Sequence, residues 1–305
     1  MTAADIGTRV RGDAGRDDGR AAGARAAVRP PARRRGAAGR RVRVVVAVAV
    51  CAVMLFPLYL MVVTAFSPRD EVVSDQLHLF PAAPTLGNFT RVFALTYFWT
   101  WFGNSVVISA IVTAITVVVN LLAGYAFAKL PFPGRNPLFL LLLGTMMVPV
   151  QAIIVSQFRI VTALNLVGTF WAVIIPSAAT AFGIFLARQF IIAIPDELIE
   201  AARVDGAGRF RTFFSIVLPL CKPLVAVLVL LTFMYQWNDF LWPLIVLREP
   251  PLQTLPVALQ AFRGQYTTDY GGLMAMTLVS VAPMVVLFLA FQRYFVQGLA
   301  RTGIR

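Results

Sequence analysis

Few side chains in this chain of 305 residues offer acid–base, nucleophilic or metal chemistry. The single histidine, His78, has no histidine or cysteine near it, and Cys51 and Cys221 match no metal-ligand spacing. The only lysines are Lys129 and Lys222, and neither follows a glycine, so the chain carries no phosphate-binding Gly-Lys-Ser/Thr motif. The sequence therefore predicts no catalytic centre, no metal and no cofactor, and any ATP hydrolysis is expected on a separate chain.

One carboxylate lies within an apolar run, where burying its charge in lipid would be energetically unfavourable. Asp239 is the one acidic residue inside an apolar run, about 15 residues and ~22 Å along a helix from the run's beginning. Such a group is a functional candidate by default. Tyr235, Trp237 and Asn238 flank it, and amide and ring groups can bond or stack on a sugar. We expect these four residues, with Asn104, to line a substrate pathway; a structural hydrogen bond or a gate between helices is the alternative. The weaker candidates, which more often join helices, are Asn104, Asn120 and Gln151.

Apolar runs must position these groups. Hydrophobic residues make up 59% of the chain, charged residues only 13%, and mean hydropathy is +0.77, whereas soluble domains carry about 25% charged residues. Six runs have the roughly 20 residues needed to span a bilayer. These runs are Val44–Phe66, Asn104–Phe127, Pro137–Gln157, Leu166–Leu186, Leu224–Leu247 and Gly272–Leu289. The predicted fold class is all-α, a polytopic membrane bundle of six transmembrane helices.

The basic residues predict the orientation of this bundle. Residues 1–43 hold twelve of the 27 basic residues in an Arg-, Ala- and Gly-rich stretch, predicted to be a disordered cytoplasmic tail. With this tail inside, 22 basic residues fall on the inner side and five on the outer side, which predicts that both termini are cytoplasmic. We therefore expect a multi-pass membrane protein, in contact with lipid rather than nucleic acid.

The inner loop over residues 195–219 begins with a predicted helix. Pro195 suits a first helical position, and acidic residues follow it where the helix dipole favours them. Leu198, Ala201 and Ala202 are spaced to share one face, and the small alanines permit close approach by another surface. Gly206 then interrupts the helix and permits a sharp turn.

A second short helix is predicted after this glycine. Phe210, Phe213, Phe214 and Val217 follow the i, i+3, i+4, i+7 spacing of an amphipathic helix, and Pro219 and Pro223 are expected to end it before the fifth span. Two short helices joined at a glycine elbow would then face the cytoplasm. Without further information, such a loop is most simply an amphipathic segment that stabilises the bundle.

The sequence of this loop resembles a known family. Glu200-Ala201-Ala202, two residues, Asp205-Gly206-Ala207, then a phenylalanine and Ile216-Val217-Leu218-Pro219 resemble the signature loop of binding-protein-dependent ABC importer permeases. The resemblance implies a coupling helix that docks in a cleft of the ATPase subunit. The expected docking residues are Glu200, Ala201, Ala202, Asp205, Gly206, Ala207, Phe210 and Phe213.

Two further segments resemble the carbohydrate branch of that family. Tyr235–Leu244 is similar to its fifth span, and Phe291–Leu299 to the C-terminal end of maltose-type permeases, whereas Ala300–Gly303 departs from the usual Thr-Ala-Gly run. The resemblance covers about Asn104 to Leu299. It places a permease domain at 44–299, with the coupling loop at 195–219 and a short tail at 300–305.

The resemblance implies a sugar or oligosaccharide importer that is not itself an enzyme. Its expected partners are a second permease subunit, an ABC ATPase dimer and an extracellular solute-binding protein. Relatives that carry polyamines share the loop, so a non-sugar cargo is an alternative. A secondary transporter is a further alternative, but it would need ion-coupling groups, and only Asp239 qualifies within the spans.

Overall fold

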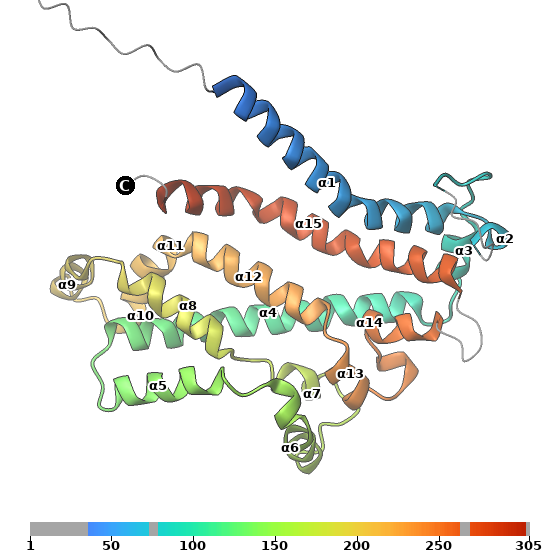
Figure 1. Cartoon of the computed structure of the whole chain (residues 1–305). Coiled ribbons are helices and arrows are strands. Elements are labelled where there is room, and N and C mark those ends of the chain that lie inside the picture. The colour runs from blue at the N-terminus through green and yellow to red at the C-terminus, as the bar shows by residue number, and fades with distance from the viewer. Residues whose placement is uncertain (1–35, 73–78, 263–268, 303–305) are drawn as a thin grey trace, which may run out of the picture. The chain divides into compact units, whose positions relative to one another are not determined.

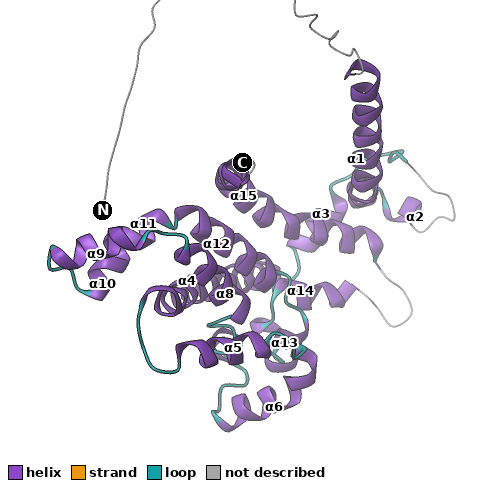
Figure 2. Ribbon diagram, turned by 60° about the vertical axis from the view of Figure 1, so that its left-hand side comes forward, coloured by secondary structure: helices purple, strands orange, loops and turns teal. Residues whose placement is uncertain are grey.

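The computed structural model describes residues 36–72, 79–262 and 269–302, and these residues form helices and connecting loops with no strand among them (Figures 1 and 2). This confirms the all-α prediction. Residues 1–35 of the predicted tail, His78 and residues 303–305 lie outside the described part. α1 begins at Gly36 and α15 ends at Thr302, so helix extends into both segments predicted as tails.

The chain divides into two compact units, residues 1–53 and 54–305. α1 (Gly36–Phe66) crosses this boundary. In the first unit, apolar side chains such as Val45 and Val53 are exposed, at 66% and 74%. An apolar helix without a buried face suits a bilayer.

The second unit is built around α4 (Phe98–Lys129), a helix of 32 residues that is ~48 Å long, longer than a bilayer's hydrocarbon core of about 30 Å. One buried stripe of this helix is small or polar: Ser105, Ser109, Thr113, Thr116, Asn120 and Gly124. Small side chains permit close helix packing in membranes. A Cβ atom on Gly124 would lie only 2.4 Å from the Cβ atom of Ala187 on α8, so α4 and α8 (Ala181–Ile192) pack with almost no gap.

Within the described residues, three helices are long and apolar enough to cross a membrane: Gly39–Phe66, Phe98–Lys129 and Tyr270–Gln292. They correspond to the predicted first, second and sixth spans. The predicted third run is not one straight helix, because α5 (Arg135–Thr145) and α6 (Val150–Ala163) are bent by 103° across residues 146–149, which include Pro149.

The fourth and fifth predicted runs are also broken. Leu166–Leu186 contains the short helix α7 (Trp171–Ile174), a turn that includes Pro176, and then α8. Leu224–Leu247 contains α12 (Lys222–Trp237), a break and α13 (Leu241–Val246). Each break frees backbone groups that membrane bundles satisfy with neighbouring helices. The number of spans therefore stays a prediction.

The remaining helices are the long α15 and a set of short ones. They are α2 (Arg69–Val72), α3 (Gly87–Phe93), α9 (Asp196–Val204), α10 (Arg209–Thr212), the π-helix η1 (Phe213–Val217), α11 (Leu218–Leu220), η2 (Pro250–Leu252), α14 (Leu255–Ala258), η3 (Leu259–Phe262) and the long α15 (Tyr270–Thr302). Within the second unit, α9 and α10 lie at one end of α4, and α3 and α14 lie at the other (Figures 1 and 2).

Candidate functional site

The segment from α9 to η1 is held as a defined elbow. α9 ends in a Schellman motif, in which the backbone N–H of Ala207 donates to Ala202 O at 2.8 Å and that of Gly206 to Arg203 O at 3.0 Å. Gly206 has φ +78°, and no atom lies within 4 Å of a Cβ built on it. Glycine is therefore required here by backbone conformation rather than by lack of space. The predicted glycine elbow is confirmed.

Burial divides the residues that were predicted to share one face of α9. Ile199 and Ala202 are buried, whereas Leu198 is 44% and Val204 87% exposed, and Ala201 is exposed beside them. A helix turns about 100° per residue, so Leu198, Ala201 and Ala202 lie within about 100° of one another around the axis and the predicted spacing holds. Their burial divides them: Ala202 faces the bundle with Ile199, whereas Leu198 and Ala201 face outward with Val204.

Val204 was missed by the sequence analysis. Val204 is the last residue of α9, and its apolar side chain is almost fully exposed in a segment that otherwise carries many charged residues. The available signal was a second set of apolar residues with a spacing of three, Leu198, Ala201 and Val204, beside the set at 199 and 202.

The four residues predicted to share a face after the elbow divide into two pairs. Phe213 and Val217 are buried, and the Phe213 ring lies 5.3 Å from the Tyr125 ring of α4. Phe210 and Phe214 are 73% and 55% exposed. The prediction of a single apolar face was wrong: only Phe213 and Val217, the two ends of the π-helix η1, face the bundle, and Phe210 and Phe214 face outward.

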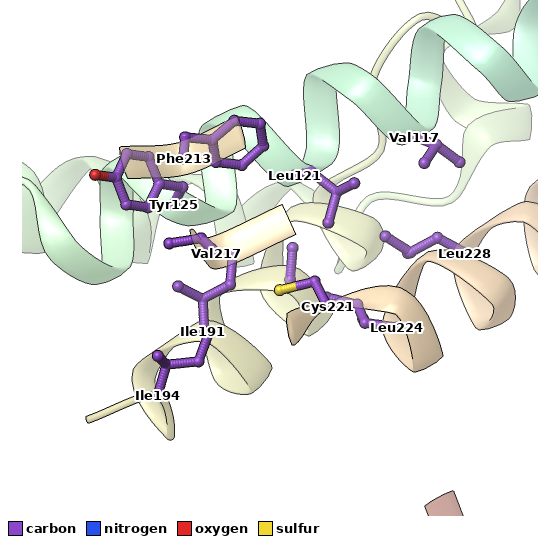
Figure 3. Packing of buried hydrophobic residues seen from close by; sticks show 11 residues of the cluster. Val117, Leu121, Tyr125, Ile191, Ile194, Phe213, Val217, Cys221, Leu224 and Leu228 are labelled. Atoms are coloured by element: carbon purple, nitrogen blue, oxygen red, sulfur yellow. The ribbon is translucent and has the colours of Figure 1, made fainter. Parts of the chain in front are cut away.

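This buried half ties the elbow to the bundle. Figure 3 shows Phe213 beside Tyr125, and Val217 between α4 and α8. The cluster contains Val117, Leu121, Tyr125, Ala187, Ile191, Ile194, Phe213, Val217, Cys221, Leu224 and Leu228. It joins η1 to α4, α8 and α12, so Phe213 and Val217 anchor the second half of the elbow to the bundle, while Ala201, Val204 and Phe210 remain exposed.

The exposed surface of the elbow carries charges of both signs around these apolar residues. Glu200 and Asp205 are exposed, as are Arg203, Arg209 and Arg211. An exposed apolar centre with a charged rim is typical of a protein interaction surface. We call the set Leu198, Ala201, Val204 and Phe210 the outer face of the elbow.

The second candidate region lies at the break between α12 and α13. Asp239 is in this break, and its carboxylate accepts a hydrogen bond from the backbone N–H of Trp242, near the beginning of α13. Asn238 is exposed and donates to Met234 O at 2.7 Å, within its own helix end. Tyr235 is 65% exposed. These three residues remain candidates for a pathway, because each is at least partly open.

Two of the predicted pathway residues have structural partners. The Trp237 side chain is 2% exposed, and its Nε1 donates to Ser280 O at 3.0 Å, so it joins α12 to α15. The Asn104 amide donates to Pro251 O and Gln253 O, both at 2.9 Å. It thus fixes the loop around η2 against α4.

Known proteins share this architecture. One chain of a bacterial ABC transporter involved in the import of the acidic polysaccharide alginate matches with a TM-score of 0.77 at 22% identity, over 85% of this chain and 96% of that one. The arabinooligosaccharides transport system permease protein AraQ is 38% identical over 83% of this chain and 92% of the relative in Halalkalibacterium halodurans. The sn-glycerol-3-phosphate transport system permease protein UgpE of Escherichia coli is 35% identical over 81% of this chain and 91% of the relative.

A family match agrees with these relatives. Residues 120–301 match the binding-protein-dependent transport system inner membrane component, and this range contains the elbow, the break at Asp239 and most of α15. Similarity at this level over most of both chains confirms the resemblance inferred from Glu200–Ala207. The chain belongs to the family of inner membrane components of binding-protein-dependent transport systems.

Proposed function

We propose that this chain is a permease subunit of an ABC importer for an oligosaccharide. The observation that supports this cargo most strongly is the 38% identity to an arabinooligosaccharide permease over 92% of that relative's length. The Tyr235–Asp239 segment supplies a ring, an amide and a carboxylate, the kinds of group that bind sugar hydroxyls and faces.

The outer face of the elbow is the proposed ATPase-docking surface. Ala201, Val204 and Phe210 present open apolar area, and Glu200 and Asp205 lie beside them to pair with basic groups of a partner. Buried Phe213 connects the elbow to the cluster around Tyr125, and Ala202 is buried on the inner side of α9. Gly206 and Ala207 fix the angle between the two halves of the elbow.

The proposed assembly also contains a second permease subunit, two ATPase copies and an extracellular solute-binding protein. Support for the last comes from the family description and from a solved alginate transporter in complex with a periplasmic protein, whose TM-score to this chain is 0.57. We propose cytoplasmic termini and a cytoplasmic elbow, because the basic residues concentrate on that side.

Uptake by reconstituted vesicles tests this function. The chain would be purified with the permease, ATPase and binding protein encoded beside it, and labelled arabinooligosaccharide, sn-glycerol-3-phosphate and spermidine would be offered in turn. ATP-dependent uptake of the oligosaccharide supports the proposal. Uptake of glycerol phosphate, the cargo named for the 35% identical relative, would show that the proposed cargo is wrong, while the proposed role as an ABC permease would stand. Uptake without ATP, driven by an ion gradient, would remove the ABC role.

A further inference from the structure

Lys129, the last residue of α4, has an unusual environment for a lysine near the end of a helix. Its side chain is only 6% exposed. An ammonium group removed from water is costly unless its donors are all used, and it has three of them. The surroundings of Nζ therefore indicate what this residue does.

Two of its acceptors are backbone carbonyls at the end of α8. The Lys129 Nζ donates to Ile194 O at 2.6 Å and, more weakly, to Ile192 O at 3.4 Å. Ile192 is the last residue of α8. Carbonyls at a helix C-terminus lack intrahelical donors and carry partial negative charge. The Lys129 ammonium supplies both a hydrogen-bond donor and a positive charge there.

The third acceptor belongs to α9, the first helix of the elbow. The Asp196 Oδ1 atom lies 2.7 Å from Lys129 Nζ, and Asp196 is the first residue of α9. The Asp196 side chain is 75% exposed, in contrast to the lysine. One ammonium thus joins the ends of α4 and α8 to the beginning of α9.

The short linker between α8 and α9 determines how freely α9 can move relative to α8. Only residues 193–195 separate the two helices, and Pro195 is extended, with φ −56° and ψ 136°. A helix joined by three residues can pivot about that linker, unless a second tie fixes it. Lys129 supplies such a tie beside the linker itself.

We propose that Lys129 is a positioning residue that latches α9 to α4 and α8, so that displacement of the elbow moves these long helices instead of being absorbed in the linker. The proposal rests on the proposed ATPase-docking function of the elbow. The latch consists of one buried cation, two carbonyls and one exposed carboxylate. Its loss should separate ATP hydrolysis from transport without preventing assembly.

The number of substrate molecules transported per ATP, measured in vesicles with the complete transporter, tests the latch. Lys129→Met should lower this ratio about fivefold to tenfold, because a charged hydrogen-bond donor is lost and the carbonyls are left unpaired. Asp196→Ala should lower it only about twofold to threefold, because an exposed ion pair contributes little. The matched control is Glu197→Ala, which removes an exposed acid from the same turn of α9.

A charge swap distinguishes the latch from a simple ion pair. If only the pair mattered, Lys129→Asp combined with Asp196→Lys would restore coupling. The latch predicts no restoration, because the new carboxylate at 129 would face the carbonyls of Ile192 and Ile194. Restoration by the swap would overturn the proposal.

Assembly is measured in parallel, as copurification of the ATPase. Wild-type ratios in Lys129→Met and Asp196→Ala would also overturn the latch, while the docking function would stand. If Lys129→Met does not assemble, the exposed Asp196→Ala variant decides: a reduced ratio supports the latch and an unchanged one contradicts it. If the unmodified chain itself binds no ATPase, the proposed function fails, and the latch with it.

Discussion

Asn120 and Thr180 form a reciprocal pair of hydrogen bonds between α4 and the beginning of α8. The Asn120 Nδ2 donates to Thr180 Oγ1 at 3.0 Å, and the backbone N–H of Thr180 donates to Asn120 Oδ1 at 3.1 Å. The same hydroxyl accepts from the backbone N–H of Gly183 at 3.2 Å and caps α8. A Cβ atom on Gly183 would overlap the Asn120 amide. The helix that leads into the elbow therefore begins at a position fixed by one buried amide.

Asn120→Leu should destabilise the protein, because it leaves the backbone N–H of Thr180 without its acceptor at a helix junction. We expect a loss of about 1–2 kcal/mol, measured as a lower midpoint of thermal unfolding in detergent. Gln151→Leu is the control, since Gln151 is an exposed amide and should change the midpoint little. Equal effects in the two variants would show that the pair with Thr180 contributes nothing.

Gly206→Pro should disrupt the elbow, because proline fixes φ near −65° and removes the N–H that bonds to Arg203 O. ATPase copurification should fall strongly, while the chain remains inserted in the membrane. Gly206→Asn should be tolerated best among non-glycine residues, since asparagine tolerates positive φ. If the proline variant binds ATPase as the unmodified chain does, the elbow's angle has no role in docking.

Single cysteines test the proposed orientation. In a background with Cys51 and Cys221 replaced by alanine, cysteines would be placed at the exposed positions Gly208 and Glu249. No atom lies within 4 Å of a Cβ at Gly208, so that substitution is accommodated. An impermeant thiol reagent on intact cells should label position 249 alone, and both positions after lysis. Labelling of 208 alone in intact cells would reverse the topology.

Asp239→Asn separates two roles of this carboxylate. The amide retains an oxygen that can accept from Trp242 N–H but loses the charge, whereas Asp239→Ala loses both. If the charge acts in the pathway, both variants should lower maximal uptake about tenfold, a free-energy change of about 1.4 kcal/mol, while the complex still assembles. Uptake that is normal in the asparagine variant and low in the alanine variant would make Asp239 a helix cap only.

Residue types and spacing predicted the helical class, the glycine elbow and the family, because each depends on local properties. Hydropathy gives long apolar runs, and a glycine between two charged segments suits the positive φ that Gly206 adopts. Pro149, the residue before α6, is a helix-breaking signal in the third run, but the sequence could not predict the bend of 103° between α5 and α6 or the break before α13. Helix breaks within an apolar run depend on which neighbours satisfy the freed backbone groups, and these neighbours are distant in sequence.

The contacts of the site residues likewise depend on neighbours that are distant in sequence. Trp237 lies beside Asn238 and Asp239 in sequence, yet it is buried against Ser280 on α15, a contact over 43 positions. The sequence analysis used Lys129 to exclude a phosphate-binding motif and predicted no contact for its side chain. Its partners on α8 and α9 follow it by more than sixty positions. Only the packing of α4 against α8 brings these groups together.

The outer face of the elbow provides the most direct test of the central claim, that this chain transports by docking an ATPase there. Val204 and Phe210 are its most exposed apolar side chains, at 87% and 73%. The measurement is the amount of ATPase that copurifies with the double variant Val204→Asp, Phe210→Asp, relative to the unmodified chain. Asn136→Asp is the control, because it adds an acid at an exposed position on the same predicted membrane side.

We predict that the double variant retains less than about a tenth of the ATPase, since charge placed in an apolar interface costs several kcal/mol, and that the control retains nearly all of it. Full copurification with the double variant would contradict docking at this face, and with it the account of the elbow as the coupling element.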